Sequence, residues 1–269
     1  MYFKIDFYMI LKEVMEKINS FAPNSYQESF DNSGLQVGDM SQNINSVLVC
    51  LDVTEDVLNE AISRGANLIV SHHPLIFHGL KRVTIDTYIE RIIRLAIKND
   101  IAIYSMHTNL DKIRYGVSLR LAEELKLKNI SILSKDKENV NIGLGAIGDT
   151  DEEYDELEFL QYVKQKLNLQ VLKHSPLLHK KVKKVALCGG SGAEFISEAI
   201  AQQADIYITA DVKYHEYFTV DNQLVIVDVG HYESEIVTKS ITYEQLIGFF
   251  PPFAVAIYHP DTNPVCHSS

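Results

Sequence analysis

Cysteine is scarce in this sequence, and no two cysteines stand at the spacing of a metal-binding or redox motif. The 269 residues include only Cys50, Cys188 and Cys266, which lie far apart along the chain. An odd number of widely separated cysteines argues against both a disulfide framework and a thiolate zinc site. Cys50 and Cys188 stand in apolar, strand-like runs, so we predict that both are small buried hydrophobic residues.

The start of the chain lacks a long uncharged apolar run. The segment 2–18 is apolar in character, but six charged residues interrupt it: Lys4, Asp6, Lys12, Glu13, Glu16 and Lys17. This pattern fits neither a signal peptide nor a membrane span, and we therefore expect cytoplasmic residence. Apolar residues recur here at helical spacing, which predicts an amphipathic helix packed on a core.

Basic residues are outnumbered by acidic ones. The chain has 25 Lys and Arg against 36 Asp and Glu, which gives a formal net charge of −11 and a pI near 5.4. The negative electrostatic field of such a protein repels phosphate backbones, so general nucleic-acid binding is disfavoured. A local basic groove remains compatible with this net charge. The hydrophobic content of 46% is ordinary for a soluble globular protein with a real core.

Short β-branched runs alternate with amphipathic helical runs along most of the chain. We expect strands at 47–51, 68–70, 101–104, 143–147, 185–188, 206–209, 224–229 and 253–258. Helices are expected from residue 55 and at 87–98, 117–125, 156–167, 193–202 and 235–246. The alternation predicts an α/β fold with mainly parallel or mixed sheets. The Lys- and Asn-rich stretch 126–141 breaks the pattern, so we predict two α/β lobes, 1–128 and 129–269.

Two histidines follow the predicted strand at 68–70, at the strand end where open α/β sheets gather ligands. His72 and His73 come directly after Ser71. Adjacent side chains on extended chain point to opposite sides, so each histidine can serve a different ion of a close pair. A His-His-Pro sequence is also common as a surface turn, and alone it is a weak signal.

Two further strand ends each supply a histidine and a carboxylate four residues apart. His107 and Asp111 follow the strand at 101–104, and His231 and Glu235 follow the strand at 224–229. If the chain turns helically after the strand, each pair shares one face and can hold a common ion. An ion pair, or an acidic residue that complements a helix dipole, is the alternative explanation.

Three independent strand ends with metal-type side chains make a coherent ligand set. Its members are His72, His73, His107, Asp111, His231 and Glu235. Imidazole and carboxylate favour zinc, iron, manganese, cobalt or nickel over calcium or magnesium. Two divalent ions carry about four positive charges and two carboxylates cancel half of them, which favours an anionic ligand and bound hydroxide. The sequence therefore predicts two transition-metal ions in a cleft between the lobes, with hydrolytic capacity.

Seven motifs, in order over nearly the whole chain, match one family of proteins. They are Asp31–Gly38, His72–Pro74, His107–Asp111, Cys188–Gly192, Asp211–His215, Gly230–Glu235 and Thr262–Val265. In these motifs the chain resembles the Nif-three-like family of dinuclear-metal proteins, whose members are often labelled GTP cyclohydrolase type 2-like. The resemblance implies that the six ligands hold two metal ions. It also implies two α/β lobes per subunit and a toroidal homohexamer, a trimer of dimers with metal sites facing an internal cavity.

The chain differs from other members of that family in two respects. The connection at 126–141 is too short for the domain that longer members carry in mid-chain, so this chain resembles the compact form. Ala210 stands where the family more usually has glycine, a change with little bearing on the ligands.

Polar residues near these motifs are candidates for contacts to substrate or to the metal ligands. Asp211, Lys213 and His215 form one such group, since Lys213 and His215 can both touch an anion. His215 can alternatively be a core histidine that donates to a carbonyl. Gly190 lies in a glycine-rich turn whose N–H groups either receive an anion or serve tight packing. Tyr232 stands between two predicted ligands and is expected to line the cavity.

Other polar residues have simpler interpretations. Thr54 is expected to cap the helix that begins at Glu55, whereas Asp52 either reaches the site or assists the cap. The remaining histidines lack partners at ligand spacing, and we predict surface or structural roles for His78, His174, His179, His259 and His267.

Two classes of function fit this sequence. One is a metal-dependent hydrolase of an anionic, nucleotide-like small molecule, with GTP suggested by the family label. The other is a non-catalytic metal-binding adaptor or regulator, because no general acid can be named from the sequence and a fold does not fix a function. A ring that encloses nucleic acid is a weaker hypothesis, which the acidic composition disfavours.

Overall fold

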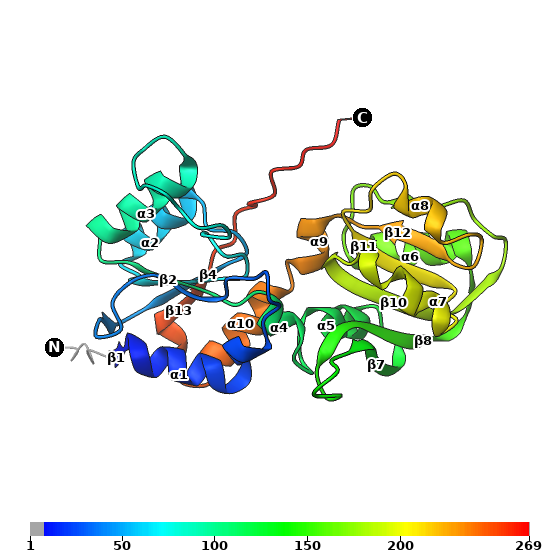
Figure 1. The fold of residues 1–269 in the computed structure, drawn as a ribbon, viewed down its shortest axis with the longest axis horizontal. Coiled ribbons are helices and arrows are strands. Elements are labelled where there is room, and N and C mark those ends of the chain that lie inside the picture. The colour runs from blue at the N-terminus through cyan, green and yellow to red at the C-terminus, as the bar shows by residue number, and fades with distance from the viewer. Residues whose placement is uncertain (1–7, 269) are drawn as a thin grey trace. The chain divides into compact units, whose positions relative to one another are not determined.

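The computed structural model describes residues 8–268, which form two compact units. Among the described residues, unit 1 contains 8–110 and Thr238–Thr262, and unit 2 contains Asp111–Val237 and 263–268. The first unit ends earlier than the predicted lobe 1–128, and the chain returns to it near the C-terminus. The return has a physical basis, because β13 (Val255–Ile257) pairs in parallel with β4 (Val47–Cys50) and completes the sheet of unit 1 (Figure 1).

Unit 1 is built on a five-stranded sheet in the order β13-β4-β5-β6-β2. β4, β5 (Leu68–Ser71) and β6 (Ala102–Ser105) are parallel, and every residue of these three strands is buried. Burial on both faces explains why they read as continuous apolar runs. β2 (Gly34–Val37) pairs antiparallel with β6, so the sheet is mixed.

Helices connect the parallel strands of unit 1, as the sequence predicts. α2 (Glu55–Arg64) follows β4, and α3 (Tyr88–Lys98) follows the loop after β5. The Thr54 hydroxyl accepts a hydrogen bond from the Val57 N–H at 3.2 Å, which confirms the predicted cap. Thr87 and Glu90 form a reciprocal capping box at the start of α3.

The remaining elements of unit 1 are short, apart from two helices. The predicted N-terminal amphipathic helix is α1 (Leu11–Phe21), and residues 2–7 of the predicted segment lie outside the described residues. A small antiparallel pair joins β1 (Met9–Ile10) to β3 (Asn43–Ile44). The other elements are η1 (Asn24–Tyr26), α10 (Thr238–Leu246) and η3 (Pro252–Ala254). α4 (Thr108–Asp111) follows β6.

Unit 2 is built on a six-stranded mixed sheet in the order β7-β8-β10-β11-β12-β9. β10 (Lys181–Ser191), β11 (Ile206–Ala210) and β12 (Val225–Asp228) are parallel. β8 (Gly143–Asp155), β7 (Lys128–Lys135) and β9 (Lys173–His174) add antiparallel pairs. The helices of unit 2 are α5 (Val117–Glu124), α6 (Glu156–Lys166), η2 (Ala193–Phe195), α7 (Ile196–Ala201), α8 (Glu216–Thr219) and α9 (His231–Glu235).

The stretch 126–141 is not the break in the pattern that its composition suggested. Half of it is β7, an edge strand whose eight residues include only one that is buried, Leu133. An edge strand with mostly exposed side chains carries many polar residues, and its composition therefore resembles that of a linker.

Each unit has its own hydrophobic core. Cys50 belongs to the core of unit 1 and Cys188 to that of unit 2, as predicted, whereas Cys266 is exposed. Burial raises the pKa of the Cys188 thiol to about 12, and the nearby carboxylates of Asp111 and Glu235 add to this increase. Both thiols are therefore protonated packing residues. No helix within residues 8–268 has the length and apolar character needed to cross a membrane.

Candidate metal centre

Three histidine side chains meet at the carboxyl ends of two parallel strands of unit 1. His72 and His73 follow β5, and His107 follows β6. Their ring centroids are 5.0 to 5.6 Å apart, and each ring offers a nitrogen within 4.8 Å of nitrogens on the other two. The chain bends at His72 and His73, so the extended backbone that would send the two rings to opposite sides is absent there. The three imidazoles form one compact donor group.

Each of these rings is oriented by an acceptor on its Nδ1 atom. His72 Nδ1 lies 2.8 Å from the backbone oxygen of Met106 and His73 Nδ1 lies 2.7 Å from Asp52 Oδ1. His107 Nδ1 lies 2.7 Å from Asp31 Oδ1. A carbonyl or carboxylate only accepts, so Nδ1 carries the proton and the neutral ring presents its lone pair at Nε2. Outer acceptors of this kind fix the tautomer of metal-binding histidines and increase their basicity.

Asp31 is the most extensively bonded of these acceptors. Its buried carboxylate accepts hydrogen bonds from His107 Nδ1, the Ser33 hydroxyl at 2.9 Å, and both the N–H and the hydroxyl of Thr108. Burial alone would raise the pKa of Asp31, but the hydrogen bonds from His107 and Thr108 lower it well below the usual range. Asp31 therefore stays ionised and holds both His107 and the start of α4 in place.

Asp52, whose role the sequence left open, orients His73. Its second oxygen accepts a hydrogen bond from the Thr262 hydroxyl at 2.8 Å. Thr262 belongs to the motif near the end of the chain. This motif therefore has a structural role, because Thr262 holds Asp52, which in turn orients His73. Asp52 therefore contacts the histidine group and is not the helix cap, which Thr54 provides.

Unit 2 holds a second donor group on α9. Gly230, with φ of 92°, turns the chain from β12 into the helix that begins at His231. His231 Nε2 lies 2.9 Å from Glu235 Oε2, so the predicted four-residue spacing does place the two side chains on one face. Asp211 Oδ2 accepts from His231 Nδ1 at 2.7 Å. This is the same carboxylate–histidine arrangement as at His73 and His107.

The electrostatics of this second group favour a cation. Burial lowers the pKa of His231, but its hydrogen bonds to Asp211 and Glu235 outweigh that effect and raise the pKa to about 10. Asp111, the last residue of α4, also lies in unit 2, and its charge and that of Glu235 both act on the Cys188 thiol. The Asp211 and Glu235 carboxylates thus concentrate negative potential around the His231 imidazole, which a proton or a metal ion can neutralise.

Comparison with known proteins identifies the family. The family model Duf34/NIF3 (NGG1p interacting factor 3) matches residues 9–264. The chain belongs to the Duf34/NIF3 family. It is 38% identical over 230 residues to a Clostridium perfringens protein named GTP cyclohydrolase 1 type 2 homolog, an alignment that covers 84% of this chain and 87% of the relative. A Campylobacter jejuni protein of the same name is 37% identical over 229 residues, covering 84% of this chain and 88% of the relative.

Solved structures share the fold of this chain. The Staphylococcus aureus protein SA1388 superposes with a TM-score of 0.90 at 30% identity, covering 97% of this chain and 99% of that one. Reduced HcgD from Methanocaldococcus jannaschii gives a TM-score of 0.76 at 28% identity, covering 93% of this chain and 97% of that one.

The glycine-rich turn of this Duf34/NIF3 protein packs against α9. The Gly190 N–H donates to the Ser234 hydroxyl at 2.9 Å, and the Gly189 N–H donates to the Ser118 hydroxyl at 3.2 Å. A Cβ at Gly190 would lie 2.1 Å from Glu235 Oε1. Because these N–H groups already have partners, the structure favours the packing interpretation of the turn over anion binding.

Gly190→Ala should therefore displace the Glu235 carboxylate and weaken metal binding. Gly65→Ala is the matched control, since Gly65 has a φ of 68° against 67° at Gly190 but nothing within 4 Å of its would-be Cβ. Both changes should cost about 1–2 kcal/mol of unfolding free energy for the left-handed backbone. Only Gly190→Ala should reduce metal affinity, as measured by competition with a metallochromic chelator. Equal metal affinity in the two variants would contradict the proposed contact with Glu235.

The other predicted contact residues take different positions. Lys213 and His215 are exposed, and the His215 ring contacts the Tyr214 ring at 5.2 Å, so His215 is not a core histidine. Tyr232 is half-buried on α9, directly after His231. The histidines that were predicted to be bystanders are all exposed: His78, His174, His179, His259 and His267.

Proposed function

We propose that this protein binds two divalent transition-metal ions and uses them to hydrolyse an anionic, nucleotide-like small molecule. The observation that carries the proposal is the convergence of three imidazoles whose Nδ1 atoms are all held by acceptors. The ligands would be His72, His73, His107, Asp111, His231 and Glu235, with zinc, iron, manganese, cobalt or nickel as the ions.

The residues around these ligands suit such a centre chemically. Asp31, Asp52 and Asp211 each hold one histidine through Nδ1, which directs Nε2 toward a cation without filling a coordination position. Two bound divalent ions would lower the pKa of water and stabilise negative charge that develops on a substrate. The absence of a thiolate from both donor groups is in keeping with these metals.

The substrate class follows from charge and from the relatives. Two divalent ions exceed the charge of the two ligand carboxylates, and the surplus favours an anionic ligand such as a phosphate group. Relatives in several bacteria bear the name GTP cyclohydrolase 1 type 2 homolog. GTP is therefore the first nucleotide to test.

An alternative proposal is a metal-binding adaptor or regulator without turnover. The description of the family, NGG1p interacting factor 3, names an interaction between proteins instead of a reaction. In that case the ions would stabilise a binding surface. The toroidal homohexamer that the resemblance implies, with its trimer-of-dimers arrangement, and residence in the cytoplasm are part of both proposals.

Metal analysis followed by a nucleotide screen tests the function. We expect about two transition-metal ions per chain after incubation with zinc, iron, manganese, cobalt or nickel. GTP or a related nucleotide should then be consumed by the metal-loaded protein and not by the chelated protein, as followed by phosphate and base release. Metal binding with GTP and related nucleotides unchanged would favour the adaptor, and a protein that stays metal-free would refute both proposals.

A further inference from the structure

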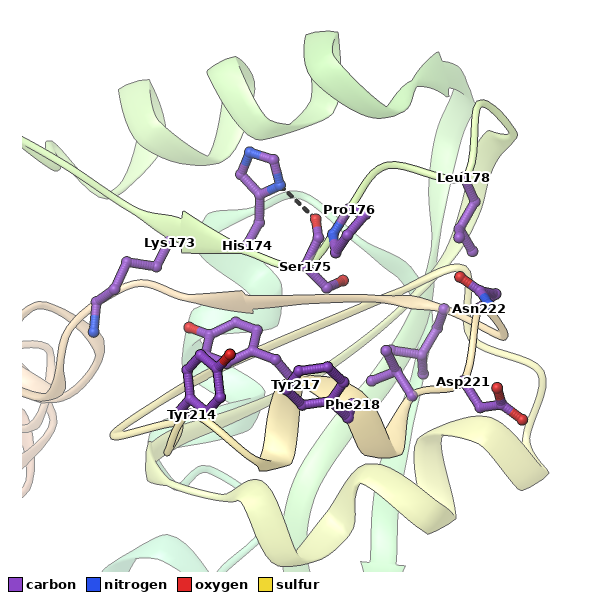
Figure 2. Close-up of a pocket in the computed structure, with 12 residues that line it drawn as sticks. Lys173, His174, Ser175, Pro176, Leu178, Tyr214, Tyr217, Phe218, Asp221 and Asn222 are labelled. Atoms are coloured by element: carbon purple, nitrogen blue, oxygen red, sulfur yellow. Dashed lines mark hydrogen bonds between the residues drawn. The ribbon is translucent and has the colours of Figure 1, made fainter.

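Unit 2 contains a cavity of about 460 Å³ between the β9 segment and α8. This volume lies in the range of pockets that bind small molecules. Figure 2 shows Lys173 at one end of the cavity, Asp221 and Asn222 at the other, and three aromatic rings between them.

The walls of the cavity combine aromatic rings with aliphatic side chains. Tyr214, Tyr217 and Phe218 supply the rings, and Val220 and Leu224 are among the aliphatic residues. The Tyr214 and Phe218 rings lie 5.5 Å apart at 67°, and the two residues are 73% and 65% exposed. These two exposed rings offer a surface on which a planar ring can pack.

The Tyr217 hydroxyl distinguishes this cavity from a purely apolar one. It is buried, and within the part of the chain that the structure describes it has no hydrogen-bond partner. Burial, with the charge of Asp228 next, raises the pKa of Tyr217 to about 12, so the hydroxyl remains a neutral donor. An unsatisfied buried hydroxyl is costly. The Tyr217 side chain as a whole is only half-buried, so a small shift of its ring would turn the hydroxyl toward an occupant with an acceptor at its edge.

The lysine end of the cavity is connected to the metal-binding part of unit 2. Lys173 Nζ lies 2.9 Å from Asp228 Oδ2, and the other oxygen of Asp228 accepts from the N–H of Gly230, the residue before His231. The positive charge of Lys173 also acts on Asp211, which holds His231. A molecule lying along the cavity could therefore extend from the aromatic rings past a cation toward the donor group on α9.

We propose that this cavity binds a planar heteroaromatic ring of purine size, as one part of the anionic molecule on which the metal centre acts. The inference rests on the proposed function, because it assigns the recognition of the ring to residues distinct from the metal ligands. Ring stacking on Tyr214 and Phe218 and one hydrogen bond from Tyr217 supply the binding interactions. A hydrocarbon chain would leave the Tyr217 hydroxyl unsatisfied.

Calorimetric binding of three probes to the full-length protein tests this proposal. Guanosine carries the ring alone, inorganic triphosphate carries the anion alone, and GTP carries both. Guanosine should bind the metal-free and the zinc-loaded protein alike, whereas triphosphate should bind only the zinc-loaded protein. Adenosine, tested in parallel, shows whether the cavity selects one purine.

Tyr217→Phe removes only the hydroxyl and should weaken guanosine about tenfold. The melting temperature of ligand-free Tyr217→Phe should not fall, because the removed hydroxyl makes no hydrogen bond within the described residues. Phe218→Ala should weaken guanosine by about tenfold or more through lost stacking. Tyr115→Phe makes the same chemical change as Tyr217→Phe at an exposed tyrosine of unit 2 that does not line the cavity, and should change nothing. Triphosphate affinity should be equal in all of these variants.

The outcomes separate this inference from the proposed function. In one outcome, triphosphate binds the zinc-loaded protein, but guanosine either fails to bind or binds all variants equally. This result would overturn the cavity assignment and leave the metal proposal standing. Guanosine that binds through Tyr217 and Phe218 in a protein with no metal affinity would overturn the metal proposal and the link between the two sites. The inference is supported if Tyr217→Phe and Phe218→Ala both lower the affinity for guanosine and the zinc-loaded protein also binds triphosphate.

Discussion

Glu235→Gln should remove most of the metal-binding capacity of this protein while leaving the fold intact. Glu235 Oε2 lies 2.9 Å from His231 Nε2 and the residue is almost fully buried, so the carboxylate faces the donor group directly. Glutamine has nearly the same shape but carries no charge, so the proposed two-metal site would lose one of its two ligand carboxylates and keep its surplus of cationic charge. The loss of affinity should exceed the roughly 10- to 100-fold that follows from changing an outer partner of a ligand.

Glu233→Gln is the control, because it makes the same change two residues earlier on α9. Glu233 Oε1 accepts a hydrogen bond from Asn263 Nδ2 at 3.0 Å, and the Glu233 carboxylate packs against Gly230. Glutamine can still accept that bond through its amide oxygen, so metal content should remain near that of the wild type. Metal stoichiometry of both variants, measured after dialysis against a mild chelator, decides the assignment. Equal loss in both variants, or full metal content in Glu235→Gln, would refute the role of Glu235.

Asp31→Asn should weaken both the fold and the metal centre. The Asp31 carboxylate accepts bonds from His107, Ser33 and Thr108, and an amide would place an N–H₂ group against some of these donors. Hydrogen bonds to a buried charged group contribute about 1.5–3 kcal/mol each, so a loss on the order of 3 kcal/mol in unfolding free energy is expected. Metal affinity should fall about 10- to 100-fold, because a neutral amide is a weaker acceptor for His107 than the carboxylate and no longer increases the basicity of its ring.

The pH dependence of stability provides an independent measurement of the Asp31 effect. The folded-state pKa of Asp31 is lower than its unfolded value, so its stabilising contribution is complete above about pH 4 and is lost as the pH falls further. Asp31→Asn should flatten this acid limb in denaturant unfolding of the metal-free protein. Asp39→Asn, at an exposed carboxylate whose pKa is lowered only by its hydrogen bonds from Ser41, should flatten the limb far less. An acid limb of wild-type steepness in Asp31→Asn would contradict the assigned role.

The candidate metal ligands were accessible to sequence reasoning because their signals are local. His72, His73 and His107 directly follow apolar strand-like runs, and parallel strands bring their carboxyl ends to one edge of a sheet. The spacing of His231 and Glu235 needs only one helical turn to bring the two side chains together. The strand ends and the four-residue spacing depend on neighbouring residues alone, whereas the meeting of His107 with His72 and His73 also requires β5 and β6 to pair.

The residues that orient the ligands left no comparable local signal. Asp31 is separated from His107 by 76 positions and Asp52 from His73 by 21, and neither spacing follows a helical or strand period. Asp31 stood in a recognised motif and Asp52 at a strand end, but nothing in either segment indicates a histidine partner. Pairing of this kind is decided when the sheet assembles, since only then do the loops after different strands meet.

The sequence by itself determined the α/β class, most helices and strands, and the polar strand ends, because hydrophobic periodicity and capping act within a few residues. Only the tertiary structure decided that β13 returns to the sheet of unit 1 and that the polar stretch 128–135 is an edge strand. It also decided that β9 and α8 enclose an aromatic cavity. These features depend on which distant segments come together in space. That choice is made by burial of apolar surface across the whole chain, and local conformational preference does not specify it.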